Sequence, residues 1–271
     1  MVKYGHLCIS NGVTIMETTE KAAYFSTSLE KGLRILDLFA TGRDLLTLSE
    51  ISTKISVNKT STYRFVNTLV KLGYLKKDPE TKQLRLGLKT VAFARDFLEN
   101  LDLTEDVKSL VDDAYGRYHV NIDLAVREGD HLIIRYRREM KDTLTFNMPT
   151  VSNQLYCSGL GKAVLAHLPK EELTGYLKRT PLKLRTERTI IRKETLLEEL
   201  EKTRRRGYSI NNQEYIPGLL AIGAPLMNLH SRKVVGAISF DVSTIQYSID
   251  KLERQFSKAV QDLASEISKF I

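Results

Sequence analysis

The sequence predicts an α+β protein: a small helical domain with a two-stranded hairpin, a linker helix, and a larger domain of helices around a mixed or antiparallel sheet. Two short amphipathic helices separated only by residues 56–58, a basic hairpin directly after them, and strand patterns beyond residue 120 support this prediction. At 271 residues the chain is long enough for two cores, because domains commonly contain about 100–150 residues.

The segment 58–73 is predicted to form a helix with one apolar face and one face rich in hydrogen-bond donors. Asn58 can cap its start, and Gly73 suits the left-handed residue that ends a helix. The apolar face is predicted to consist of Phe65, Val66, Leu69 and Leu72.

A second short helix is predicted just before it. Thr47 and Glu50 have the spacing of a capping box, which indicates a helix over 49–55. A short helix, a tight connection and a donor-rich second helix form the helix-turn-helix pattern, whose second helix enters the major groove of DNA. Residues 74–77 and 83–87 are expected to pair as a wing around the turn 78–82.

The remaining elements of the first half complete this domain. Residues 1–27 show no sustained periodicity and are expected to be a flexible tail or an extra arm. A helix over 28–40, with Leu33 among its core residues, should pack behind the other two, so residues 28–88 form the predicted winged domain. The apolar pattern of 89–103 predicts a linker helix, which is either a coupler or dimer contact or simply the last helix of this domain.

The positive charge gathers in this half of the chain. Residues 28–90 hold 12 Lys and Arg against 6 Asp and Glu, whereas residues 104–271 hold 26 against 22. An ordinary surface helix with solvated charges would show the same amphipathic pattern. The concentration of charge near the helix-turn-helix favours double-stranded DNA as the partner.

Within that interface, the second helix is expected to read bases and the lysines to contact phosphates. Arg64 suits a bidentate contact with guanine, and the wing lysines suit phosphate contacts. The predicted DNA-binding residues are Lys59, Thr60, Ser61, Thr62, Tyr63, Arg64, Lys71, Lys76, Lys77 and Lys82.

Residues 104–271 are predicted to alternate strands with helices. A helix over 194–206 is expected to turn Leu197 inward, and an apolar repeat predicts a final helix from about 249. Strands are expected at 122–127, 131–138, 144–148, 221–227 and 233–241, and further helices at 107–118, 158–168 and 170–178.

Other protein classes lack their sequence signals. The two cysteines lie far apart, the five histidines are dispersed, and no apolar run approaches the roughly 20 residues that cross a bilayer. Cys157 and Ser158 adjoin a glycine-rich turn, but no Gly-x-Ser-x-Gly elbow is present. We therefore expect a cytoplasmic protein with no catalytic residues, metal, cofactor or membrane partner. A ligand-independent architectural DNA-binding protein and a small-molecule enzyme remain the alternatives.

Several motifs, in order, resemble those of the IclR family of transcription regulators. The resemblance covers roughly residues 28–268 and implies a winged domain, a linker helix and a GAF-like effector-binding domain over 104–271. It also implies a homodimer or dimer of dimers, an operator near metabolic genes and a small-molecule effector, often an organic acid. The family includes both repressors and activators, so the sign stays open, with repression slightly favoured. The motifs lie at 28–36, 58–64, 155–163, 207–209, 214–218 and 236–239.

The resemblance also implies an effector pocket. Residues 158–161 could present backbone N–H groups of a helix N-terminus to a carboxylate, although their glycines could equally just close a tight turn. Many relatives have cysteine at Ala221 and a small hydroxyl residue or glycine at Asp241, so a mono-acid with an apolar or aromatic body is expected. The implied effector-binding residues are Leu144, Phe146, Met148, Leu155, Ser158, Gly159, Leu160, Gly161, Asn212, Glu214, Ala221, Ser239 and Asp241.

Overall fold

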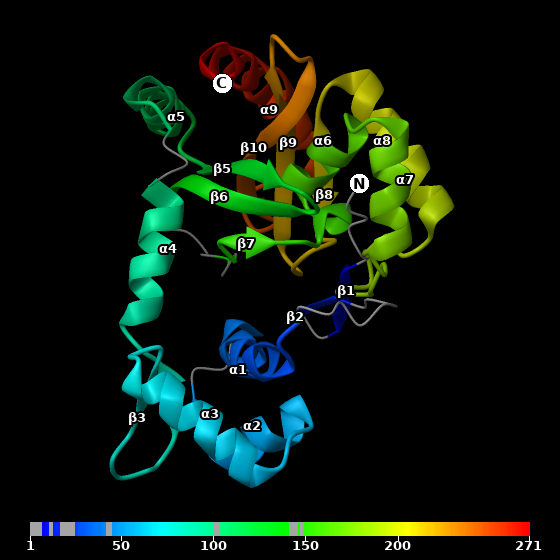
Figure 1. The fold of residues 1–271 in the computed structure, drawn as a ribbon. Coiled ribbons are helices and arrows are strands. Elements are labelled where there is room, and N and C mark those ends of the chain that lie inside the picture. Colours follow the sequence, from blue (N-terminus) through cyan, green and yellow to red (C-terminus); the bar gives the residue numbers. More distant parts are fainter. Residues whose placement is uncertain are drawn as a thin grey trace. The chain divides into compact units, whose positions relative to one another are not determined.

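The computed structural model describes residues 7–10, 13–16, 25–41, 45–99, 103–140, 146 and 149–271. The chain divides into two compact units, Met1–Asp102 and Leu103–Ile271 (Figure 1). Helices and antiparallel strands occur in both units, so the predicted α+β class is confirmed.

The first unit begins with a hairpin in the segment that was expected to be a tail. Strands β1 (Leu7–Ser10) and β2 (Val13–Met16) pair antiparallel, with Ser10 opposite Val13. The sequence carries a signal for this hairpin in the dipeptide Asn11-Gly12, which favours a two-residue turn but was not given weight.

The helix-turn-helix and its wing form the rest of this unit. One buried core joins the helix-turn-helix to the wing, with Ile35, Ile51, Val66, Leu75 and Leu84 at most 2% exposed. The elements are α1 (Thr27–Asp37), η1 (Leu38–Thr41), α2 (Leu48–Ile55), α3 (Lys59–Lys71), β3 (Leu75–Lys77), β4 (Leu84–Leu86) and α4 (Lys89–Glu99).

Three leucines that were predicted to be buried are exposed. Leu33 on α1, Leu72 at the end of α3 and Leu197 on the later helix α8 (Lys193–Arg206) are 52%, 51% and 43% exposed. Helical periodicity locates an apolar stripe but does not say which margin of it is covered. On α3 the buried stripe runs through Thr62, Val66 and Leu69, so it keeps Val66 and Leu69 of the predicted face and includes Thr62 in place of Leu72.

The second unit is built on one antiparallel sheet in the order β7-β6-β5-β10-β9-β8. Edge strands β7 and β8 were not predicted. Of the strand expected at 144–148 the structure describes only residue 146, which is not in a strand. The strands are β5 (Asn121–Glu128), β6 (His131–Arg138), β7 (Val151–Ser152), β8 (Ser209–Asn212), β9 (Leu219–Asn228) and β10 (Lys233–Ser243).

Helices cover both faces of this sheet (Figure 1). On one face, Phe256 packs against Phe240 of β10 with ring centroids 5.7 Å apart. On the other face, Ala163 and Leu165 pack with Ala125 and Ala237 of the sheet. The first face carries α5 (Glu105–Tyr118) and α9 (Ile249–Ile267); the second carries η2 (Leu155–Cys157), α6 (Gly159–Ala166), α7 (Lys170–Arg179) and α8, and η3 (Ser268–Phe270) ends the chain.

Candidate functional site

Local hydrogen bonds fix the helix-turn-helix geometry. In α2, the backbone N–H of Thr47 donates to the Glu50 carboxylate at 2.7 Å and that of Glu50 to the Thr47 hydroxyl at 3.3 Å, which is the predicted capping box. Asn58 caps α3 by accepting from the backbone N–H of Ser61 at 2.8 Å. Gly73 ends it with a φ of +85°, where a side chain would be strained. The start and the end of α3 are therefore set by its own sequence.

Helix α3 presents a donor-rich face to solvent. Lys59, Thr60, Tyr63, Arg64 and Lys71 are exposed, and Ser61 is half-buried. No salt bridge engages Arg64 in the described part of the chain. These side chains are therefore available to bases and phosphates, as a recognition helix requires.

Thr62 is a correction to the predicted interface. Its side chain is fully buried, and its hydroxyl donates to the backbone carbonyl of Asn58 at 3.0 Å. The residue lies on the core side of α3, one helical turn before Val66. It therefore stabilises the turn between the helices and is out of reach of DNA.

The wing hairpin exposes more basic groups than the sequence singled out. Leu75 pairs with Leu86 and Lys76 with Arg85, so these two cations lie on one face of the hairpin. Arg85 was missed, because only the strand register reveals that it accompanies Lys76. Lys77 is also exposed.

The wing turn is held by Asp78. The Asp78 carboxylate accepts from the backbone N–H groups of Thr81 at 2.7 Å and Glu80 at 3.0 Å, and these bonds, led by that of Thr81, lower the pKa of Asp78. The Lys82 ammonium donates back to the Pro79 carbonyl at 2.5 Å. The Lys82 ammonium is therefore engaged within the turn, and Lys76 and Lys77 are freer to donate hydrogen bonds to phosphates.

In the second unit, the sheet face toward α6, which we call the α6-side face, gathers polar residues from four strands. Asp241 of β10 lies opposite Ala221 of β9, and Ser239 lies opposite Asp123 of β5. Strand alternation puts these side chains on the face that β8 and β9 present to α6, where the Ser209 hydroxyl donates to the Gly159 carbonyl at 2.5 Å. Of the predicted effector residues, Ala221, Ser239 and Asp241 are thus brought together.

A charged cluster completes the α6-side face, and two of its members, Asp123 and Arg137, were not predicted from the sequence. Arg137 of β6 makes two hydrogen bonds with Asp123, at 2.6 and 2.8 Å. Asp241 is 7% exposed, and its Oδ1 has no hydrogen-bond partner. Burial, together with the nearby Asp123 carboxylate, raises the pKa of Asp241 to about 8 despite Ser239 and Arg137. Asp241 is therefore mainly a neutral acid at pH 7.

The glycines in the first turn of α6 serve close packing. A Cβ at Gly161 would lie 2.1 Å from the Leu155 carbonyl oxygen, and one at Gly159 would lie 3.1 Å from the Ala221 Cβ. The N–H of Gly161 is already bonded to the Ser158 hydroxyl at 3.0 Å. Of the two readings left open by the sequence, these contacts favour the tight turn over a ligand cradle at Gly161. Leu155 and Leu160 are buried beside these glycines.

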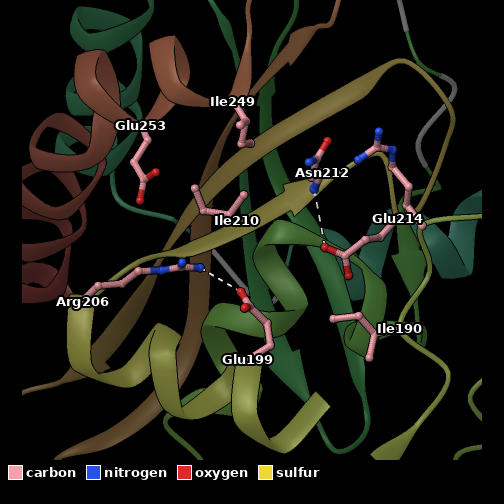
Figure 2. Close-up of a pocket in the computed structure, with 9 residues that line it drawn as sticks. Ile190, Glu199, Arg206, Ile210, Asn212, Glu214, Ile249 and Glu253 are labelled. Atoms are coloured by element: carbon pink, nitrogen blue, oxygen red, sulfur yellow. Dashed lines mark hydrogen bonds and ion pairs between the residues drawn. The ribbon is translucent and has the colours of Figure 1, made fainter. Parts of the chain in front are cut away.

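Asn212 does not share the α6-side face with Ser239 and Asp241, and Glu214 lies beyond the end of β8, where its carboxylate accepts from the Lys162 ammonium of α6. Along β8, side chains alternate, so Asn211, opposite Ala221, is the residue on that face. Asn212 and Glu214 line a separate cavity (Figure 2). The sequence motif placed all of them in one pocket because spacing alone does not fix the strand register.

The aromatic and apolar wall is described only in part. Phe146 is half-buried, and its ring lies 4.0 Å from the position that a Cβ would take at Gly218. Leu144 and Met148 fall outside the described residues.

The structure offers little for catalysis or metal binding. Burial raises the pKa of Cys157 to about 12, so its thiol is a poor nucleophile at neutral pH. Among the described residues, no group of three or more His, Cys, Asp or Glu could hold a metal ion. In the same part of the chain, no helix combines the length and apolar character that a membrane span requires.

Two family models match this chain. Residues 28–79 match the IclR helix-turn-helix domain, and residues 95–269 match the bacterial transcriptional regulator IclR C-terminal domain. The HTH-type transcriptional regulator KipR of Bacillus subtilis (strain 168) is 30% identical over 244 residues, which cover 89% of this chain and 95% of that protein.

Solved structures show the same fold. The crystal structure of the Thermotoga maritima IclR is 25% identical, with a TM-score of 0.65, and the match covers 89% of this chain and 97% of that one. An IclR homologue from Microbacterium hydrocarbonoxydans, complexed with 4-hydroxybenzoate, is 19% identical, with a TM-score of 0.70 over 90% of this chain and 98% of that one. The predicted winged helix-turn-helix and GAF-like domain are thereby confirmed, and the chain belongs to the IclR family of transcriptional regulators, which pair a DNA-binding domain with an effector-binding C-terminal domain.

Proposed function

We propose that this regulator binds an operator through α3 and the wing, and that a small organic acid bound on the α6-side face changes its affinity. Operator binding is supported by the two faces of α3, one with a buried stripe and one that exposes Tyr63 and Arg64. Arg64 reads a guanine, and Lys59, Lys71, Lys76 and Lys77 contact phosphates.

For the effector, the chemistry of the α6-side face supports a mono-acid. Arg137 is already neutralised by Asp123, and Asp241 is mainly protonated at pH 7, so the face offers no surplus positive charge to a dianion. A protonated Asp241 can donate a hydrogen bond to one carboxylate. The 4-hydroxybenzoate bound by the Microbacterium homologue is an acid of this class, with an aromatic body that Phe146 suits here.

We also propose how many copies act together and whether the regulator represses or activates. Two or four copies act together on a two-fold operator, with half-sites about one helical turn apart or a multiple of it. Effector binding changes the separation or angle of the DNA-binding heads through α4 in the linker 89–103, and the regulator acts as a repressor. Winged domain 28–88, linker 89–103 and effector domain 104–271 are the working parts of this scheme.

The test is a fluorescence anisotropy titration of the DNA upstream of the protein's own gene, at several salt concentrations. We expect specific binding that weakens with salt, and an Arg64→Ala variant that loses about 1–3 kcal/mol of discrimination between specific and random DNA. Arg117→Ala, which removes an exposed arginine of the second unit, is the matched control. Equal preference in wild type and Arg64→Ala would reject the recognition-helix assignment.

The effector half is tested in the same assay. Addition of 4-hydroxybenzoate or a related mono-acid should shift the operator titration of the wild type, and the shift should be lost in Asp241→Leu. A shift that persists in that variant would place the effector elsewhere.

A further inference from the structure

A second cavity lies beside edge strand β8, and neither Ser239 nor Asp241 lines it (Figure 2). It has a volume of about 430 Å³, which suits a small metabolite. Its walls come from the loop before α8, from α8 itself, from β8 and from the start of α9. The lining residues are Arg188, Ile190, Glu199, Arg206, Ile210, Asn212, Glu214, Ile249 and Glu253.

The walls of this cavity are held in place by bonds among the lining residues and their neighbours. Arg206 donates to Glu199 at 2.9 Å, and the Tyr208 hydroxyl donates to Glu253 at 2.7 Å. The loop before α8 is tied to the end of β8, because the Thr189 hydroxyl donates to the Glu214 carbonyl at 2.7 Å. The cavity is therefore preformed, and most of its charges are already satisfied.

Two charged side chains at the cavity have polar atoms that no described residue engages. Glu214 is 6% exposed; its Oε1 lies 2.5 Å from the Lys162 ammonium, but its Oε2 has no hydrogen-bond partner. Arg188 is exposed, and within the described ranges its guanidinium makes no ion pair. A buried carboxylate oxygen without a partner is costly, so a ligand that donates to it gains affinity.

The rest of the lining is aliphatic. Ile190, Ile210 and Ile249 line the cavity between its polar side chains (Figure 2). A ligand that meets all these groups carries an ammonium, a carboxylate and a branched aliphatic body.

We propose that this cavity binds a free aliphatic α-amino acid. The ammonium donates to Glu214 Oε2, the carboxylate pairs with Arg188, and the side chain lies against the three isoleucines. The chain therefore senses a second metabolite, at a site distinct from the effector site on the α6-side face.

Isothermal titration calorimetry of the full chain tests this proposal, with L-leucine at concentrations up to about 10 mM, so that millimolar Kd values are measurable. Two probes dissect the ligand: isoamylamine lacks the carboxylate of leucine, and 4-methylpentanoate lacks its ammonium. We expect leucine to bind, and each truncated probe to bind at least about tenfold more weakly, since each loses one charge-assisted hydrogen bond.

Variants locate the site. Glu214→Gln and Arg188→Gln should each weaken leucine binding by about tenfold or more. Arg188 is exposed, so its variant is expected to fold normally even if Glu214→Gln does not. Arg192→Gln, which makes the same change on a 77% exposed side chain outside the cavity, should leave binding unchanged.

Three results would overturn the proposal. The first is that leucine does not bind the wild type, and the second is that isoamylamine binds as tightly as leucine. The third is that leucine binding is lost in Asp241→Leu but is unaffected by Arg188→Gln. The last result would assign leucine to the α6-side face instead.

Discussion

Replacing Asp241 with asparagine should stabilise the second unit at neutral and alkaline pH and destabilise it slightly in acid. The folded chain raises the pKa of this carboxyl from 3.8 to about 8. Between these values the unfolded chain carries the carboxylate and the folded chain the neutral acid. Folding therefore takes up a proton, and the free energy of unfolding falls as the pH rises.

The size of the effect follows from the pKa. A rise in the pKa from 3.8 to about 8 is roughly four units, at about 1.4 kcal/mol each. Above pH 8 the wild type therefore loses on the order of 5 kcal/mol in its free energy of unfolding. Asparagine does not titrate, but its amide brings two N–H donors into a buried site where the neutral acid has one O–H, and a donor left without a partner costs about 1–3 kcal/mol. We expect the variant to be more stable by roughly 2–4 kcal/mol at pH 8.5 and less stable by about 1–2 kcal/mol at pH 4.

The assay is urea unfolding at pH 4, 7 and 8.5, followed by far-UV circular dichroism, because the chain has no tryptophan. Asp113→Asn, an exposed aspartate on α5, is the matched control and should leave the pH dependence unchanged. If Asp241→Asn and wild type lost stability in parallel from pH 4 to 8.5, the argument that Asp241 is buried as a neutral acid would fail.

Three further substitutions test the packing described above. Thr62→Val should lower the free energy of unfolding by about 1 kcal/mol and leave DNA affinity unchanged, because a buried hydrogen bond is lost; weaker operator binding in anisotropy would return Thr62 to the interface. Gly161→Ala should cost about 1–3 kcal/mol or more in urea unfolding, since its Cβ meets the Leu155 carbonyl; a neutral effect would contradict that contact. Lys162→Met should lower the free energy of unfolding by about 3–5 kcal/mol, because it leaves Glu214 buried without its cation. The double variant Lys162→Met with Glu214→Leu should regain much of this stability, and a double variant as unstable as Lys162→Met would contradict the buried salt bridge.

The first unit was predictable from the sequence because its signals are local. A capping box at Thr47 and an N-cap at Asn58 fix helix starts within a few residues of chain, and both appear in the structure. Thr62 is one exception, since a threonine in a helix is read as polar although a bond to the preceding turn lets it be buried.

The second unit was predictable in its elements but not in its site. Which residues share the α6-side face depends on the register between β10, β9 and β8, which places Asn211 there and turns Asn212 away. The pairing of Arg137 with Asp123 joins strands β5 and β6 across a register shift between Leu124 and Ala125, and no spacing rule anticipates such a shift.

The central pairing of the sheet has a consequence for how the protein is made. Strand β5 bonds to β10, so that Asn121 lies opposite Asp241, and these two partners leave the ribosome far apart in time. The first unit needs only contacts within its own segment, and contacts close in sequence form fastest. In a nascent chain the first unit is therefore expected to be folded before β10, the partner of β5, has been synthesised. During that interval the apolar faces of β5 and β6 depend on chaperones or on rapid elongation to avoid aggregation.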